Sequence, residues 1–281
     1  MTTTKPKPFL ICIPGLLGGS EDFSSILPIW RKHMEVIVLD PNEQQRLQGG
    51  LNISESYMKS VNYETTSEQV AAAITSRKLK GAFLVGISLG GKIVYDFAAK
   101  FPHLFLGGVV TDFGTGPFRD TELHRFVYDL VTKTPLHLPW PEVREYLREN
   151  IPERSLRSLI QSQISYPDQK PPGLWKSAMK NLREMLERQS IGQQYPVLKK
   201  AESQLSKQGS KIIVLQAERI SGIGKNSIPD MDNISCIKRV PVADSSHFLH
   251  VTHKDLICKT VLETMNIPSH KDERRLETPG T

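Results

Sequence analysis

The chain has 281 residues, of which 38% are hydrophobic and 23% are charged, a composition typical of a soluble globular protein with a sizeable core. Its formal net charge of +6 comes from 36 Lys and Arg against 30 Asp and Glu. Spread over this length, the excess is too weak to indicate a nucleic-acid surface, so we expect no nucleic-acid partner.

The sequence also argues against insertion in a membrane. No apolar run approaches the roughly 20 residues that cross a bilayer, so we expect no stable membrane insertion. The apolar start at 9–17 is interrupted by Pro14 and Gly15, and no small-residue cleavage site follows, which favours a buried strand over a signal peptide.

The three cysteines lie in apolar segments and have no metal-ligand spacing: Cys12, Cys236 and Cys258. They are typical of reduced thiols, which favours a cytoplasmic location.

Short apolar runs between turn residues predict strands at 9–13, 34–39, 81–85, 106–111, 211–216 and 236–242. These runs are rich in Val, Ile and Leu and lack strict alternation, as is typical of parallel strands covered on both faces. Apolar residues at three- and four-residue spacings predict helices at 68–74, 89–101 and 249–265. The alternation predicts an α/β fold with a doubly wound, mostly parallel sheet.

The interval 116–209 breaks this alternation. It contains no clear strand, and it has apolar residues at helical spacing in 123–130, 143–147, 156–164 and 174–186, separated by prolines. We therefore predict a core at 1–115 and 210–267, an all-helical cap inserted at 116–209, and a charged, disordered tail at 268–281. Residues 121–210 carry 14 Lys and Arg against 10 Asp and Glu, which would favour an anionic substrate such as an acyl-CoA.

One motif carries chemistry. Gly86-Ile87-Ser88-Leu89-Gly90 matches G-x-S-x-G, in which a serine occupies a sharp turn between a strand and a helix. The turn strains the serine backbone, and a side chain two residues before or after it would collide with the neighbouring strand and helix. A predicted strand precedes the motif and a predicted helix follows it. Ser88 is therefore a candidate nucleophile, and the alternative is a tight turn with an incidental serine.

Three segments together resemble the α/β-hydrolase superfamily over nearly the whole chain. They are the strand and loop at 11–19, the turn at 86–92 (GISLGGK), and Ser246-His247-Phe248-Leu249-His250 after the last predicted strand. Within the superfamily, Gly90-Gly91-Lys92 and Val110-Thr111-Asp112 resemble small bacterial serine esterases and acyl-CoA-type thioesterases.

The resemblance implies an oxyanion hole formed by the backbone amides of Leu16 and Leu89. Two amides aimed at the carbonyl oxygen would stabilise the negative charge that develops there during acyl transfer. Most relatives have a histidine where this chain has Pro14, and proline lacks an amide hydrogen.

A general base is expected after the last strand. His247, His250 and His253 recur every third residue, but no Cys or carboxylate cluster joins them, so no metal site is predicted. His247 precedes the helix and is the candidate base for Ser88. His250 is expected to support the core.

The acid of the triad has two candidates. Relatives usually carry it after the penultimate strand, where this chain has Ile220, whose side chain cannot orient an imidazole. Asp112 follows the strand at 106–111, at the sheet edge where active sites converge, and it is the predicted acid. Glu218 is the alternative acid, and a chain without a functional acid is the third reading. In the esterase group an aspartate at this place can serve, assisted by a serine that would be Ser221 here.

These residues predict a serine-dependent hydrolase of a small carboxylic ester or thioester that works through an acyl-enzyme, without a metal or organic cofactor. Phe126, Trp140 and Trp175 are candidate substrate-binding residues in the cap, with cap packing as the alternative. Two other functions stay open: a carbon-carbon bond hydrolase or lyase on the same fold, and a non-catalytic ligand-binding or regulatory homologue, which Pro14 and Ile220 suggest. The sequence predicts no oligomeric state.

Overall fold

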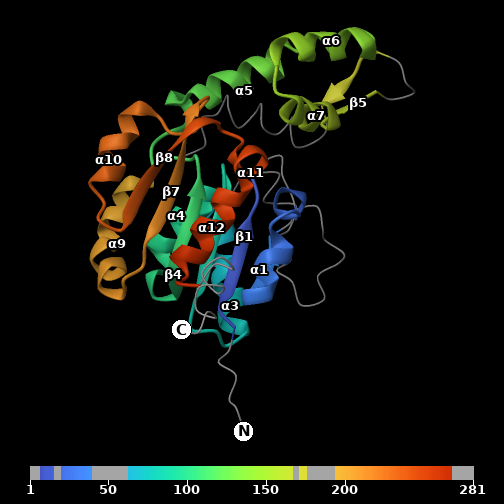
Figure 1. The fold of residues 1–281 in the computed structure, drawn as a ribbon. Coiled ribbons are helices and arrows are strands. Elements are labelled where there is room, and N and C mark those ends of the chain that lie inside the picture. The colour runs from blue at the N-terminus through green and yellow to red at the C-terminus, as the bar shows by residue number, and fades with distance from the viewer. Residues whose placement is uncertain (1–6, 16–19, 40–62, 167–170, 176–193, 268–281) are drawn as a thin grey trace, which may run out of the picture.

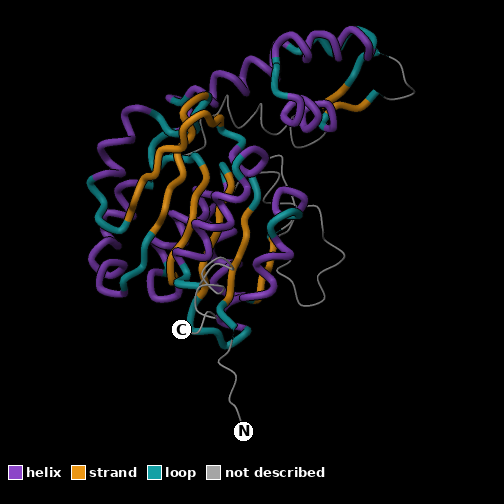
Figure 2. The backbone as a smooth tube through the Cα atoms, in the orientation of Figure 1, coloured by secondary structure: helices purple, strands orange, loops and turns teal. Residues whose placement is uncertain are grey.

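A central parallel sheet organises the chain in a computed structural model, which describes residues 7–15, 20–39, 63–166, 171–175 and 194–267. Within these ranges, six strands pair in the order β2-β1-β3-β4-β7-β8, and every pair is parallel (Figure 2). The strands are β1 (Phe9–Ile13), β2 (Glu35–Val38), β3 (Ala82–Ile87), β4 (Phe105–Thr111), β7 (Ile212–Arg219) and β8 (Ile237–Ser246). The predicted doubly wound α/β architecture is confirmed.

Helices cover both faces of this sheet (Figure 1). One apolar cluster joins one face of the sheet to α3 (Tyr63–Ser76), α4 (Gly90–Lys100) and α9 (Tyr195–Gln208). A second cluster joins the other face to α1 (Leu27–His33) and α12 (Lys254–Thr264). In β1, Leu10 and Cys12 enter the second cluster while their neighbours enter the first. Burial on both faces explains why the strands are continuously apolar.

The register brings the carboxyl ends of the central strands to one edge. Ile13 of β1 pairs with Gly86 of β3, and Ile87 pairs with Thr111 of β4. Thr111 in turn pairs with Leu215 of β7. Because the strands are parallel, the residues that follow β3, β4, β7 and β8 meet at this edge.

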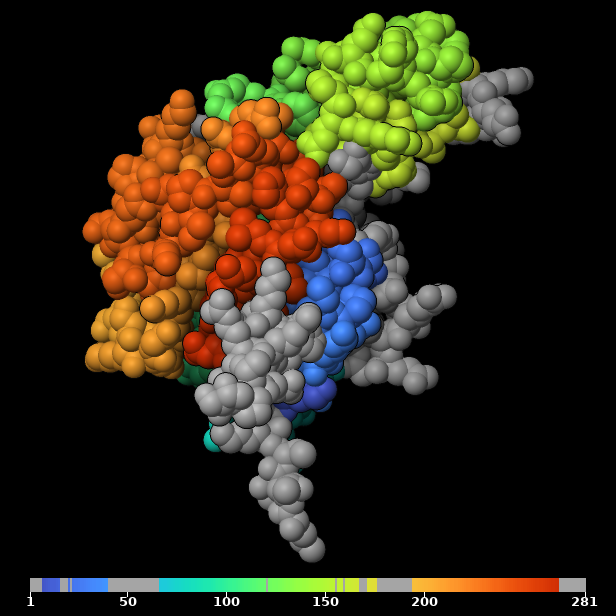
Figure 3. All heavy atoms as spheres, in the orientation of Figure 1, coloured from blue at the N-terminus to red at the C-terminus, as the bar shows by residue number. Residues whose placement is uncertain are grey.

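Residues 122–166 and 171–175 project from the sheet as a separate lobe, which is green to yellow-green in Figure 3. It contains α5 (Glu122–Lys133), α6 (Trp140–Asn150) and α7 (Arg154–Ser162). An antiparallel pair, β5 (Ile164–Ser165) and β6 (Leu174–Trp175), follows them. The prediction of an all-helical cap is therefore wrong in this respect. Residues 176–186, predicted as helical, lie outside the described residues.

The end of the predicted cap also needs revision. Helix α9 lies against α4 on the face of the sheet, and its Leu198 and Leu205 are buried in the cluster of that face. We infer that the cap ends before α9, and "cap" below means residues 116–175. The predicted tail at 268–281 lies outside the described residues.

The C-terminal region differs from its prediction in one detail. The helix expected at 249–265 is two helices, α11 (Leu249–Thr252) and α12, separated at His253. Between β7 and β8 lie a short 3-10 helix (Lys225–Ser227) and α10 (Ile228–Asp232). Further 3-10 turns occupy Ser20–Phe23, Pro102–Leu104 and Phe118–Asp120. None of the described helices combines the length and the apolar content that spanning a membrane requires.

Candidate active site

Ser88 occupies the turn between β3 and α4. Its φ of 51° lies in the left-handed region, which a serine adopts only when its surroundings hold it there. The Ser88 amide donates to the Thr111 carbonyl at 3.1 Å, and the Gly91 amide donates to the Ser88 carbonyl at 2.8 Å. The neighbouring strand and the helix that follows thus fix the serine backbone from both sides.

The glycines of the motif are required by close packing. A Cβ on Gly86 would lie 2.6 Å from the carbonyl oxygen of Gly90, and a Cβ on Gly90 would lie 2.4 Å from the carbonyl oxygen of Ile13. Both distances are shorter than any van der Waals contact, and both involve backbone that cannot move aside. The steric role expected for these glycines is what the packing requires.

His247 joins Ser88 to Asp112. The Ser88 hydroxyl lies 2.7 Å from His247 Nε2, and His247 Nδ1 lies 2.8 Å from Asp112 Oδ2. A carboxylate only accepts, so Nδ1 carries the proton and Nε2 is free to accept the proton of the serine hydroxyl. The His247 side chain is 4% exposed and that of Asp112 is fully buried. The three side chains come from different loops at the same sheet edge and form one continuous hydrogen-bonded chain.

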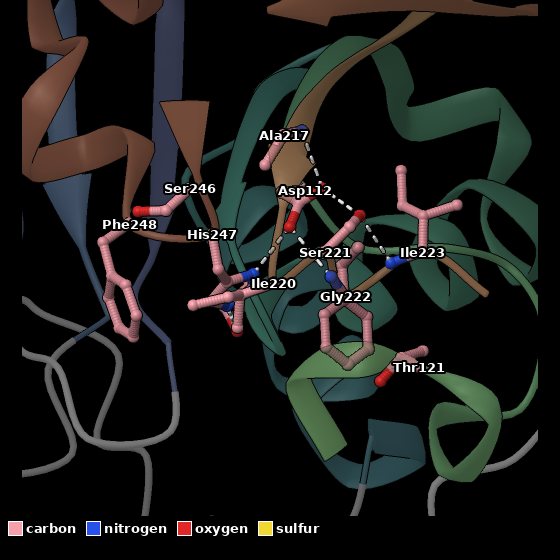
Figure 4. Close-up of polar contacts among 12 residues, drawn as sticks. Asp112, Thr121, Ala217, Ile220, Ser221, Gly222, Ile223, Ser246, His247 and Phe248 are labelled. Carbon is pink, nitrogen blue, oxygen red and sulfur yellow. Dashed lines mark hydrogen bonds and ion pairs between the residues drawn. The ribbon is translucent and has the colours of Figure 1, made fainter. Parts of the chain in front are cut away.

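The Asp112 carboxylate is surrounded by hydrogen-bond donors (Figure 4). Oδ1 accepts from the Ala217 amide at 2.8 Å and from the Ser221 hydroxyl at 2.6 Å. Oδ2 accepts from the Gly222 amide at 2.8 Å as well as from His247. Four donors on two oxygens thus satisfy a carboxylate that is sealed from water. The contact expected of Ser221, a hydroxyl that supports the acid, is present.

Glu218 is placed differently. It is exposed, and its Oε2 accepts from the Asp244 amide at 2.7 Å. Of these two candidate acids, Asp112 is the one whose carboxylate contacts His247. Ile220, at the place where relatives carry the acid, has a φ of 51°, and its amide donates to Glu122 Oε2 at 3.0 Å. The turn after β7 therefore supplies donors to the acid instead of the acid itself.

The described residues include one of the two predicted oxyanion-hole amides. Leu16 lies outside the described residues. Leu89 is buried immediately before α4, and within the described part of the chain its amide has no protein acceptor. An amide at this place is available to a substrate oxygen beside Ser88. Pro14 is buried, and a Cβ on Gly90 would lie 2.8 Å from its carbonyl oxygen, so the Pro14 loop packs closely on the start of α4.

His250 lies beside the site without entering the hydrogen-bonded chain. Burial, and to a smaller extent the nearby His247, lowers the pKa of its imidazole to about 4. Its Nε2 is 3.8 Å from Asp22 Oδ1, beyond hydrogen-bond distance. Among the described residues, no group of three or more His, Cys, Asp or Glu is arranged to hold a metal ion.

Two side chains of α4, Lys92 and Tyr95, hold the loop after Asp112, a role that sequence reasoning assigned to neither. The Tyr95 hydroxyl donates to the Phe113 carbonyl at 2.7 Å, and Lys92 Nζ donates to the Gly116 carbonyl at 2.6 Å. Both side chains are fully buried, and burial lowers the pKa of Lys92 to about 7. No local pattern predicts these contacts, because the acceptors are backbone carbonyls about twenty positions away.

The cap aromatics are engaged in packing. Trp140 stacks at a tilt on Tyr166 with ring centroids 5.6 Å apart, and Trp175 Nε1 donates to the Val131 carbonyl at 3.3 Å. Phe126 is half-buried against the core cluster. These contacts favour cap packing, the alternative reading, over substrate binding for Trp140 and Trp175.

Comparisons with known proteins agree with this architecture. No family model matches the chain. The chain is 28% identical over 108 residues to a 2-succinyl-6-hydroxy-2,4-cyclohexadiene-1-carboxylate synthase of Pectobacterium atrosepticum, a match that covers 38% of this chain and 39% of that relative. A second curated relative, from Haemophilus influenzae, is matched over 36% of its length. The chain thus spans well under half the length of the curated relatives that it matches.

Solved structures match over nearly the whole chain. A marine microorganism esterase superposes with a TM-score of 0.66 at 20% identity, covering 92% of this chain and 96% of that one. The thioesterase domain from the curacin biosynthetic pathway superposes with a TM-score of 0.55 at 17% identity, covering 91% of each chain. Taken with the all-parallel sheet, the helices on both of its faces and the serine turn after β3, these matches show that the chain has the α/β-hydrolase fold.

Proposed function

We propose that the protein is a serine hydrolase that cleaves a small carboxylic ester or thioester through an acyl-enzyme. The observation that carries this proposal is the chain of hydrogen bonds from the Ser88 hydroxyl through His247 to a buried Asp112. A nucleophile bonded to a base, and a base oriented by an acid, is the arrangement that acyl transfer needs. The esterase and thioesterase folds that superpose on the chain support the same reaction class.

In the proposed reaction His247 Nε2 takes the Ser88 proton as Oγ attacks the carbonyl carbon. The resulting imidazolium is stabilised by Asp112, which bonds His247 Nδ1. We assign the oxyanion to the Leu89 amide and, as the resemblance implies, to that of Leu16. The imidazolium then protonates the departing alcohol or thiol, and water, activated by His247, releases the acid and restores Ser88.

Charge counts change the expectation for the substrate. Residues 116–175 contain eight Lys and Arg and eight Asp and Glu, so the cap is neutral. The basic excess of 121–210 arises in 176–210, with seven Lys and Arg against three acids, and part of it lies on α9, against the sheet. A neutral cap gives no electrostatic preference for an anionic acyl-CoA, so we favour neutral esters and thioesters.

A second candidate is a lyase or hydrolase of carbon-carbon bonds on the same serine. One curated relative is named as a synthase, and this observation keeps that chemistry open. A non-catalytic role loses part of its motivation, because Asp112 supplies the acid that Ile220 cannot. A cytoplasmic location remains part of the proposal, since three buried cysteines without disulfides suit a reducing compartment.

A fluorophosphonate probe tests the proposal directly. We expect covalent labelling of Ser88 in the wild type, mapped by peptide mass spectrometry, and none in the folded Ser88→Ala control. A panel of p-nitrophenyl esters, acyl thioesters and vinylogous diketones then separates ester hydrolysis from carbon-carbon cleavage. A folded wild-type protein that the probe leaves unlabelled would refute the serine mechanism.

A further inference from the structure

The turn that supports the acid is bonded on its other side to the cap. The Ile220 amide donates to Glu122 Oε2 at 3.0 Å, and the Leu123 amide donates to the Ser221 carbonyl at 3.2 Å. Glu122 and Leu123 begin α5, the first helix of the cap. In Figure 1, α5 leaves the body of the molecule beside the ends of β7 and β8. The cap therefore starts on the same turn that supplies donors to Asp112.

A short path through the Ile220 turn connects Glu122 to Asp112. Ile220 precedes Ser221 and Gly222, whose hydroxyl and amide bond the two oxygens of Asp112 at 2.6 and 2.8 Å. Ile220 holds a φ of 51°, which a β-branched residue rarely adopts without support. The Glu122 carboxylate, by accepting the Ile220 amide, stabilises that conformation. A shift of the Ile220 backbone would displace both donors of the following residues.

Helix α5 holds Glu122 in place. Thr121 caps the helix, because its hydroxyl accepts from the His124 amide at 3.0 Å and donates to the Phe118 carbonyl at 2.8 Å. A carboxylate in the first turn is further favoured by the partial positive charge of a helix N-terminus. The acceptor for Ile220 is thus fixed by the cap and not by the sheet.

The loop that carries the base has a similar link. Ser246, the last residue of β8, donates from its hydroxyl to Glu153 Oε2 at 3.3 Å. Glu153 is the residue before α7 of the cap, and Ser246 directly precedes His247. A glutamate at the start of each of two cap helices therefore bonds a loop of the triad.

We propose that Glu122 is a positioning residue that couples the cap to the triad, by holding the Ile220 turn so that Ser221 and Gly222 keep Asp112 aligned with His247. Glu153 makes the corresponding, longer contact beside the base. The inference rests on the proposed serine hydrolase function. According to this inference, the hydrogen bond from the Ile220 amide to Glu122, and not the negative charge of Glu122, keeps Asp112 aligned with His247.

Three substitutions of Glu122 separate these roles. Glu122→Ala removes the acceptor, Glu122→Asp keeps the charge on a side chain one methylene shorter, and Glu122→Gln keeps an acceptor oxygen without charge. Glu142→Ala is the matched control, because Glu142 also lies in the first turn of a cap helix and is exposed on α6. It reproduces the loss of a favourable charge at a helix N-terminus without the contact to the core.

The kinetic readout is kcat and KM for the best ester of the panel. The net contribution of one hydrogen bond predicts a fall in kcat of about 2- to 10-fold for Glu122→Ala and Glu122→Asp, with KM unchanged. Glu122→Gln and Glu142→Ala should stay near the wild-type kcat. An unchanged KM together with a kcat that Glu122→Gln preserves is the pattern that separates a positioning role from a general loss of stability.

The fluorophosphonate rate distinguishes failure of this inference from failure of the proposed function. Labelling of the wild type with slower labelling of the Ala and Asp variants supports the coupling. Wild-type labelling with equal labelling rates in all variants overturns it while leaving the serine mechanism intact. Loss of kcat in Gln together with wild-type behaviour in Asp also overturns it, because charge would then be the active property. If Glu122→Ala does not fold, the Asp and Gln pair decides the matter alone.

Discussion

Replacing Asp112 by Asn puts an amide into a site built for a carboxylate. The two oxygens of Asp112 accept four hydrogen bonds, from Ala217, Ser221, Gly222 and His247. An asparagine has one acceptor oxygen, and its NH2 group must face one pair of these donors. In either orientation it meets a backbone amide, of Ala217 or of Gly222, that cannot accept.

The magnitude follows from that geometry. One buried backbone amide without its acceptor costs about 1–3 kcal/mol of stability. If the NH2 group faces His247, it donates to Nδ1, the proton moves to Nε2, and the base can no longer accept from Ser88. That tautomer error lowers kcat on the order of 10⁴-fold in the serine protease precedent. If the oxygen faces His247, the tautomer survives, but the imidazolium loses its counter-charge, so a large fall in kcat is expected in both orientations.

The assay is steady-state hydrolysis of a p-nitrophenyl ester, with urea unfolding measured in parallel to separate catalysis from stability. The matched control is Glu218→Gln, which neutralises the exposed carboxylate that bonds Asp244 and should retain wild-type kcat. A folded Asp112→Asn protein with near-native turnover, or an inactive Glu218→Gln protein, would refute the assignment of Asp112 as the acid.

Two further perturbations test the surroundings of the triad. Ser221→Ala removes the 2.6 Å hydrogen bond to Asp112 and should lower kcat about tenfold or more, since a hydrogen bond to a charged group contributes about 1.5–3 kcal/mol. The control Ser227→Ala, which removes a buried hydroxyl bonded to the Gly224 carbonyl, should keep kcat, and equal losses in both variants would contradict the role of Ser221. Burial lowers the pKa of His250 to about 4 in the folded protein. Between this value and the ordinary pKa of histidine, the unfolded chain binds a proton at His250 that the folded chain does not. Lowering the pH through this range therefore favours unfolding. Between pH 7.5 and pH 5 the unfolding free energy of the wild type should fall by about 2 kcal/mol more than that of His250→Gln. If urea unfolding gives the same difference between the two proteins at both pH values, this linkage is excluded.

Local patterns were sufficient for the sheet and for the turn that carries Ser88. The strands are apolar on both faces, and that property appears in the sequence because each residue of a covered strand needs an apolar neighbour. The turn at Ser88 requires glycine at two fixed positions, and a steric requirement between residues close in sequence leaves a readable motif. His247 was recognisable for a similar reason, since it follows the last strand directly.

The cap shows where local patterns were insufficient. Apolar spacing predicted a helix at 174–186, but Leu174 and Trp175 form a strand with Ile164 and Ser165. Two-residue strands are too short to produce a period, so their pairing depends on the chain between them folding back. Helix α9 was not among the segments predicted as helical, and its packing on α4 depends on contacts with a segment about a hundred residues earlier.

The sequence by itself determined that this chain forms a parallel α/β sheet with a serine held at a strained turn, because both features arise from interactions between near neighbours. It predicted Asp112 as the acid and Glu218 as the alternative, but it could not place either carboxylate relative to His247. Asp112 follows β4 and Glu218 lies near the end of β7, at the same sheet edge. Only the folded structure decides that the first is sealed among donors facing His247 while the second faces solvent. That decision belongs to tertiary structure because the groups that hold Asp112 come from residues more than a hundred positions away, brought together by the register of β4 with β7.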